Sequence, residues 1–171
     1  TTSADLPTLN AYDTTQNGDW DVFLSMFSNN CSLLWSTYFG GIYCDVAWDV
    51  TIAIDRSCYV TGYTDSPDFP TQFTYNDSFG GGGDAFLARF TVNGSLLWST
   101  FLGGNSVDRG YAVAVTNNGS CYVTGETASV NFPTLNAYVD SKASGFDAFV
   151  SKFSANGSLI WSTYLGGNST D

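Results

Sequence analysis

The sequence predicts an all-β fold built from propeller-like tandem repeats, each a four-stranded antiparallel blade, and three observations lead to it. The segments "SLLWSTYFGG", "SLLWSTFLGG" and "SLIWSTYLGG" recur with a period of 63 residues, starting at Ser32, Ser95 and Ser158. Val, Ile, Tyr, Phe, Trp and Thr gather in short runs bounded by Gly, Asn, Asp and Ser, which is typical of strands, and helix signals are nearly absent. A fixed period that spans the whole chain indicates a solenoid, a propeller or an array.

The last repeat shows how the strands follow one another. We expect strands over Tyr111–Thr116, Cys121–Glu126, Asp147–Phe153 and Ser158–Leu165. The segments "TNNGS" and "SANGS" predict hairpin turns, because Asn-Gly tolerates positive φ. A longer connection with a repeated Phe/Leu-Pro-Thr core joins the second strand to the third, and it predicts an ordered arm packed on the blade. Four antiparallel strands per repeat are typical of a propeller blade.

The period also divides the chain. Residues 1–41 are expected to supply the third and fourth strands of one blade, and residues 42–104 and 105–171 each supply a full blade of the same repeat module. Propellers close with about four or more blades, so this module is incomplete on its own. A part-blade also leaves N–H and C=O groups unpaired at a sheet edge. We therefore expect continuation by a longer array, a ring of copies or a filament of copies.

Several motifs carry a family resemblance. In order, "SLIWSTYLGG", "YAVAVTNNGSCYVTGET", "NFPTLNAY" and "FDAFVSKFSANG" make the chain resemble the SBBP-type β-propeller repeat of bacterial and archaeal surface proteins, over essentially its whole length. The resemblance implies a propeller fold with "YAVAV" innermost and an extracellular or cell-surface location. It implies no catalytic residues. The first repeat departs from the pattern at "VAWDVTIAIDRSC", where the turn lacks Asn-Gly, and a two-residue shift of the strand register is open there.

Charge and composition exclude several classes of partner. Five basic residues stand against sixteen acidic ones, and the net charge of −11 disfavours nucleic acid and anionic membrane surfaces. No apolar run approaches the roughly 18 to 20 residues that span a bilayer, so we expect no membrane insertion. No basic-then-apolar signal segment follows Thr1, which predicts a mature chain or an internal fragment.

The sequence does not predict an enzyme. It contains no His, which excludes Ser-His-Asp and Cys-His chemistry, and "GGGG" at Gly80–Gly83 lacks the Gly-Lys-Ser of a phosphate loop. Carboxylate-pair hydrolysis is the last-ranked alternative. Aspartates that recur once per repeat indicate turns closed by hydrogen bonds to backbone N–H groups. Calcium ligation is the alternative for one set, because hard cations take Asp and Asn oxygens, although no EF-hand loop is present. That set is Asp21, Asp84 and Asp147, and a second recurring set is Asp45, Asp108 and Asp171.

Asn-x-Ser/Thr triplets occur six times, and they are either glycosylation acceptors or ordinary turn residues. They lie at Asn30, Asn76, Asn93, Asn118, Asn156 and Asn168. Three of them, Asn30, Asn93 and Asn156, are equivalent in the turn between the third and fourth strands. Asn118 lies in the turn between the first and second strands, at the same end of an antiparallel blade. If glycosylated, these four would form a sugar-covered face.

The four cysteines argue against zinc, because the chain has neither a C-x-x-C pair nor His. Disulfides are the preferred interpretation. Cys31 and Cys58 are both expected at the turn-bearing end of neighbouring blades, so we pair them first. Cys44 is expected at the opposite end and Cys121 repeats Cys58, so these two stay free, pair otherwise or link chains. Buried unpaired thiols are the alternative.

The aromatic residues divide into two groups. Those at a fixed strand position are expected to pack between blades or under the arm, and they are Trp35, Trp98 and Trp161. Trp20, Trp48 and Tyr43 do not follow the repeat and are candidates for a binding or assembly contact. The sequence therefore predicts an extracellular structural protein, the building block of a surface filament or larger assembly whose partners are copies of itself and covalent glycans. The alternative is a glycan-binding adhesin that uses these three aromatics on external carbohydrate.

Overall fold

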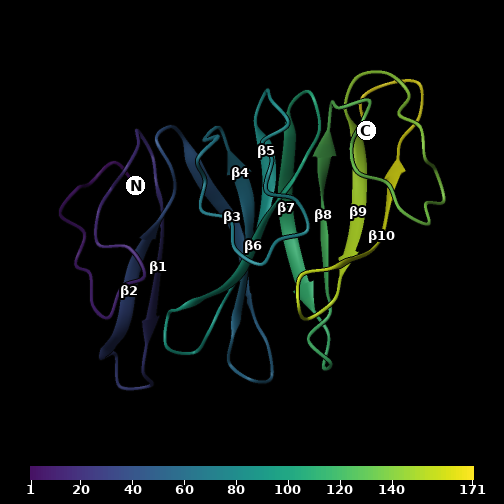
Figure 1. Cartoon of the computed structure of the whole chain (residues 1–171). Helices are drawn as coiled ribbons and strands as arrows, with labels where there is room; N and C mark the ends of the chain where they lie inside the picture. The colour runs from purple at the N-terminus through teal and green to yellow at the C-terminus, as the bar shows by residue number, and fades with distance from the viewer.

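The computed structural model describes residues 1–171 and is all-β, with ten antiparallel strands in three sheets that stand side by side (Figure 1). The first sheet contains β1 (Val22–Phe27) and β2 (Leu33–Phe39). The second contains β3 (Asp45–Ile52), β4 (Cys58–Thr64), β5 (Asp84–Phe90) and β6 (Leu96–Leu102). The third contains β7 (Asp108–Val115), β8 (Cys121–Thr127), β9 (Asp147–Phe153) and β10 (Leu159–Leu165). Within each sheet every strand pairs with its neighbour in sequence, and the three sheets do not close into a ring.

The strands of the last repeat match the sequence prediction closely. The segment Asp147–Phe153 is confirmed as β9, and the ends of β8 and β10 differ from expectation by one residue. The first strand, β7, begins three residues earlier than predicted. A β-bulge between Gly110 and Ala112 breaks the alternation of the strand there, which hides its first residues from a pattern of period two.

The first full repeat keeps the same register, so the two-residue shift considered for it is wrong. Its bulge lies between Ala47 and Asp49, the positions equivalent to Gly110 and Ala112. The turn after β3 also has the same shape in both repeats, because the Arg56 N–H donates to the Ala53 carbonyl at 2.9 Å. Arg56 has φ +64°, a left-handed conformation that Gly119 supplies in the next repeat. The repeat therefore dictates the turn even where Asn-Gly is absent.

The arms between second and third strands are ordered, as predicted. Each forms a short antiparallel bridge to the outermost strand of its sheet, in the pairs Leu9 with Ser36, Gln72 with Ser99 and Leu135 with Ser162. In the first arm the Leu9 and Ser36 N–H groups donate to each other's carbonyls at 3.1 and 2.9 Å. The arms therefore cover the outer edge of each sheet, which would otherwise present unpaired backbone groups.

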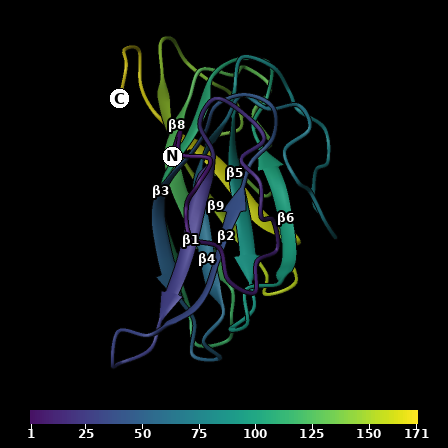
Figure 2. The same ribbon diagram turned by 90° about the vertical axis from the view of Figure 1, so that its left-hand side faces the viewer.

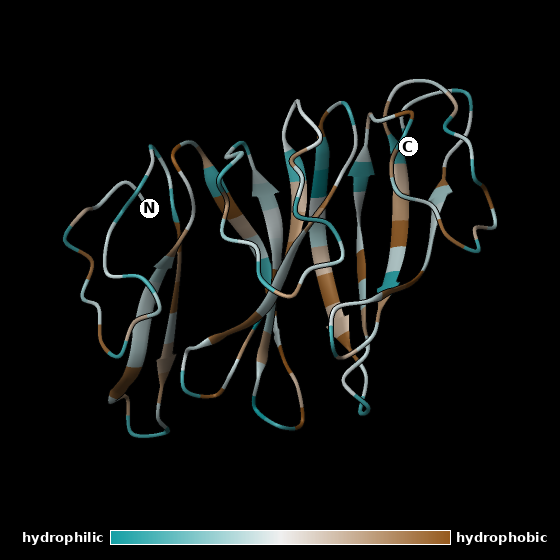
Figure 3. Ribbon diagram, in the orientation of Figure 1, coloured by the Kyte–Doolittle hydropathy of each residue, from teal (hydrophilic) through white to brown (hydrophobic).

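The hydrophobic core consists of two layers, each between neighbouring sheets. Hydrophobic segments lie along the strands of the sheets that form these layers (Figure 3). Between the second and third sheets, Tyr59, Leu87 and Trp98 pack with Phe149 and Phe153. The layer between the first and second sheets combines equivalent positions, and includes Val22, Leu24, Trp35, Phe39, Phe86 and Phe90. Each layer therefore forms where the face of one sheet is buried by the next sheet, and no single core is shared by all three sheets.

One tryptophan in each of the first two sheets donates a hydrogen bond to a turn of the next sheet. Trp35 Nε1 donates to the Val92 carbonyl at 2.9 Å, and Trp98 Nε1 donates to the Ala155 carbonyl at 3.0 Å. Glycine is required beside the indoles, because a Cβ on Gly94 or Gly157 would lie only 2.8 or 3.0 Å from the ring atoms of Trp35 or Trp98. The packing role expected for these two tryptophans is confirmed. Trp161, at the equivalent position of the third sheet, is half-exposed and its indole nitrogen has no acceptor.

We expect Trp98→Ala to lower the free energy of unfolding by about 3–5 kcal/mol, because it opens a cavity in the layer between the second and third sheets. Urea denaturation at a chain concentration too low for copies to associate measures the loss. Trp161→Ala is the matched control, since it removes the same side chain from a face that no sheet covers, and its effect should be much smaller. Equal losses at both positions would contradict the role of inter-sheet packing.

Candidate functional site

The first sheet presents an incomplete surface. β1 pairs only with β2, whereas β5 and β9 pair on both edges, so one edge of β1 is hydrogen-bonded to no strand; Figure 2 views the molecule from this side. Phe23 and Phe27 on β1 are 49% and 59% exposed, although their counterparts Phe86 and Phe90 are completely buried. We call the surface of Phe23 and Phe27, with the neighbouring face of β3, the head face.

The β3 part of the head face is apolar and uncovered for the same reason. In the third sheet, β7 packs on β4, but nothing equivalent to β4 stands beside β1 for β3 to pack on. Val50 is therefore 54% exposed, against 6% for its counterpart Val113. A groove of about 300 Å³ runs between the two strands and is lined by residues that include Leu24, Met26 and Ile52. Comparison of repeats by sequence alone missed these residues, because exposure depends on the neighbour that each repeat has.

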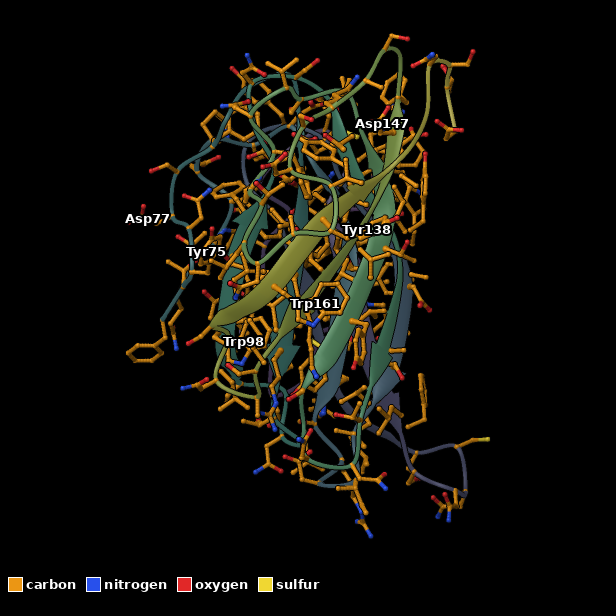
Figure 4. All side chains as sticks on the ribbon, turned by 90° about the vertical axis from the view of Figure 1, so that its right-hand side faces the viewer. Tyr75, Asp77, Trp98, Tyr138, Asp147 and Trp161 are labelled. Carbon is orange, nitrogen blue, oxygen red and sulfur yellow. The ribbon has the colours of Figure 1, made fainter.

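The opposite end of the molecule carries a second uncovered surface. On the second sheet, Tyr59, Leu87, Trp98 and Leu102 are buried under the third sheet. Their counterparts on the third sheet are not covered, and we call them the tail face, on which Figure 4 labels Trp161. The tail face consists of Tyr122, Val150, Trp161 and Leu165.

The tail face keeps the geometry of the covered surface. The ring centroids of Tyr122 and Trp161 lie 5.9 Å apart in an edge arrangement, as do those of Tyr59 and Trp98. Lys152 lies 5.1 Å above the Tyr122 ring, the distance that separates the Arg89 guanidinium from the Tyr59 ring. The tail face therefore has the arrangement of a surface that receives another sheet, without needing that sheet to form it.

The three non-repeated aromatic candidates all lie on the exposed surface, and two flank the head face. Trp20 lines a hollow with Phe23, and Trp48 lines another that also includes Phe23. Trp48 packs against Tyr111, with ring centroids 5.1 Å apart. Tyr43 is half-exposed, and its carbonyl accepts the Trp20 N–H at 3.4 Å. Trp20 and Trp48 therefore belong to the surroundings of the head face, whereas Tyr43 lines neither of these hollows.

Comparison with protein-family models finds no match to this sequence, and a search of curated proteins finds no similar chain. No helix in the fold has the length and apolarity that crossing a bilayer requires.

The sequons occupy two environments. Those in the strand turns, Asn30, Asn93, Asn118 and Asn156, are exposed at the lower end of Figure 1, and Asn168 is exposed after β10. The Oδ1 of Asn118 accepts the Thr116 hydroxyl at 2.6 Å, while its Nδ2, the atom that carries a glycan, makes no hydrogen bond. Turn formation and glycosylation are thus compatible there. Asn76 differs, because it is half-buried and its Nδ2 donates to the Ser78 carbonyl at 3.1 Å.

We expect the peptides that contain Asn30, Asn93, Asn118 and Asn156 to carry glycans in natively isolated protein, and Asn76 to be unmodified because its Nδ2 is already engaged. Intact-glycopeptide mass spectrometry measures the occupancy of each site. Asn76 serves as the internal control, since it has the same sequon. Occupied Asn76 beside empty turn sites would contradict the expected sugar-covered face.

The structure contains no disulfide, and all four cysteines are free thiols. The pairing of Cys31 with Cys58 that we placed first is absent, because Cys58 is enclosed in the core between the first and second sheets while Cys31 is exposed in the turn after β1. Burial raises the pKa of the Cys58 thiol to about 11 and that of Cys121 to about 12. Cys44 is half-buried, and burial together with Asp65 raises its thiol pKa as well.

The thiols should differ sharply in reactivity, because only a thiolate is alkylated and Cys58 and Cys121 are both buried and protonated. We expect iodoacetamide at pH 8 to label Cys31 first and to reach Cys58 and Cys121 only after denaturation. Mass spectrometry of the folded and the denatured protein counts the labels. Fewer than four labels after denaturation without reductant would show a disulfide and contradict the free thiols.

The recurring aspartates close turns, as predicted. The Oδ2 of Asp84 accepts the backbone N–H of Gly80 at 2.9 Å, and the Oδ2 of Asp108 accepts that of Gly104 at 2.7 Å. In both cases the donor stands four residues before the aspartate. The same bond occurs at the four equivalent positions, Asp21, Asp45, Asp147 and Asp171.

Proposed function

We propose that this chain is the building block of an extracellular, propeller-like filament or larger assembly, in which the head face of one copy packs on the tail face of the next. One observation carries the proposal. Phe149 and Phe153 of the third sheet bury the surface around Trp98 on the second sheet. The head-face residues Phe23 and Phe27 are the repeat equivalents of these phenylalanines, and the tail face is the equivalent of the surface that they bury.

Hydrogen bonding supports the same contact. The indole nitrogens of Trp35 and Trp98 each donate to a turn carbonyl of the following sheet. For Trp161 the equivalent acceptor is the carbonyl of Asn29, which lies in the exposed turn after β1 of a following copy. A junction between copies would therefore satisfy a donor that has no acceptor within one chain.

The unpaired edge of β1 adds a second element to this interface. Backbone N–H and C=O groups at such an edge can pair with a strand of another chain, which satisfies them and gives direction to the contact. Head-to-tail contacts of this kind form a closed ring when the rotation between copies closes and an open filament when it does not. The net charge of −11 keeps the remaining surfaces of neighbouring assemblies apart.

Two variants test the proposal. Phe23→Glu places a charge on the head face and Val150→Glu places one on the tail face, so each should reduce assembly of the full chain to monomers. Val130→Glu is the matched control, because Val130 is 70% exposed on an arm outside both faces. Electron microscopy and light scattering measure the assemblies.

Mixing the two variants provides the sharper result. Each retains one native face, so an equimolar mixture should form heterodimers and stop there, while either variant alone stays monomeric. A wild-type chain that stays monomeric at high concentration would overturn the proposal and indicate that both faces are covered by further repeats of a longer chain. Assembly that survives both charges would overturn it as well.

A further inference from the structure

Carboxylates from neighbouring sheets meet in buried pairs. Asp84 opens β5 in the second sheet and Asp108 opens β7 in the third, and both are fully buried. A Cβ on Gly103 would lie 2.6 Å from Asp84 Oδ1 and 2.8 Å from Asp108 Oδ2, so the two carboxylates converge on the space beside this glycine. Asp21 and Asp45 converge in the same way beside Gly40, at 3.1 and 2.8 Å.

These pairs have oxygens that the protein does not satisfy. Asp108 Oδ2 accepts the Gly104 N–H and the Ser129 hydroxyl, both at 2.7 Å, while Asp84 Oδ2 accepts only the Gly80 N–H. The Oδ1 atoms of Asp84 and Asp108 are buried without any hydrogen-bond partner. Burial raises the pKa of Asp108; the Thr127 hydroxyl opposes this rise but forms no well-aligned hydrogen bond with the Asp108 Oδ1. Each buried carboxylate oxygen without a partner is costly.

No basic side chain of the chain balances this charge. The two ion pairs join Arg89 to Asp55 and Arg109 to Glu126, so neither includes a member of a buried pair. Burial, with the neighbouring Asp108, raises the pKa of Asp84 to about 7. Two carboxylates so enclosed need either a shared proton or a cation between them.

We propose that a calcium-type divalent cation binds between Asp84 and Asp108 and a second one between Asp21 and Asp45, one at each junction between sheets. Hard cations of this kind take carboxylate and carbonyl oxygens at about 2.3–2.6 Å, and backbone carbonyls or water complete their six to eight ligands. Glycine is needed at positions 40 and 103, because a Cβ there would lie within 3.1 Å of the carboxylate oxygens of both aspartates. The cations would fasten neighbouring sheets within one chain, so this inference does not rest on the proposed assembly.

The last repeat contains an open version of the same site. Asp147 is buried with an unpartnered Oδ1, but its counterpart Asp171 is exposed. A Cβ on Gly167 would lie 3.9 Å from Asp171 Oδ2, whereas a Cβ on Gly166 would lie 2.9 Å from Asp147 Oδ1. One carboxylate here faces water, so we expect this position to bind a cation more weakly than the two enclosed pairs.

Calcium titration by calorimetry tests the inference. It is done on the Val150→Glu chain after removal of metal with EDTA, so that assembly does not contribute heat. We expect two saturable sites and a rise of the melting temperature with calcium. Asp84→Asn keeps the shape of the side chain and should remove one site, and Asp84→Asn with Asp21→Asn should remove both. Asp140→Asn, an exposed aspartate outside the pairs, should retain both.

A second measurement needs no variant that might misfold. Terbium replaces calcium at oxygen sites, and Tyr63, whose ring lies 2.4 Å from where a Gly83 Cβ would be, stands next to Asp84 and should sensitise its luminescence. Luminescence that calcium displaces would support the site. The proposal would be overturned if calcium up to about 10 mM gave no heat, no shift of the melting temperature and no displacement of luminescence. This concentration exceeds the dissociation constants of the weakest extracellular calcium modules. Binding that Asp84→Asn leaves unchanged, with that variant more stable than the wild type above pH 7, would indicate a shared proton and also overturn it.

Discussion

The burial of each sheet face by the next sheet is the interaction on which the structure depends. Each core layer is formed by two sheets. Leu87 and Trp98 of the second sheet are buried from solvent because Phe149 and Phe153 of the third sheet pack on them. Stability in such a fold is approximately a sum of contacts between neighbours, and the end units always lack one neighbour. The head and tail faces are therefore a direct consequence of the architecture.

The sequence was sufficient to predict the period, the all-β class, the arms and the strand positions. Each of these is determined by local composition, and the same composition occurs in more than one repeat. It was also sufficient for the turn-closing aspartates, whose donor lies four residues away. It was not sufficient where a residue departs from its equivalents. Arg56 takes the left-handed conformation of Gly119 because the surrounding ladder fixes it, and local turn chemistry did not predict that outcome.

Contacts between distant residues explain the remaining differences. Cys31 and Cys58 are both at the turn-bearing end, but the face on which each residue lies decides that one is exposed and the other enclosed in the core. The same limitation applies to the aspartate pairs. The two recurring sets are visible in the sequence as separate columns, and only the packing of β7 on the second sheet shows that Asp84 and Asp108 meet beside Gly103.

The repeat also identifies where the proposed junction between copies would differ from a junction within one chain. Gly94 and Gly157 lie directly beneath the indoles of Trp35 and Trp98, and the equivalent residue at the head face is Cys31, which has φ +62° and a side chain. Beneath Trp161 of a neighbouring copy its sulfur would hold the turn further from the ring, in a favourable sulfur–aromatic contact. The rotation between copies in the proposed assembly would therefore depend in part on this residue, and with it whether copies close into a ring or continue as a filament.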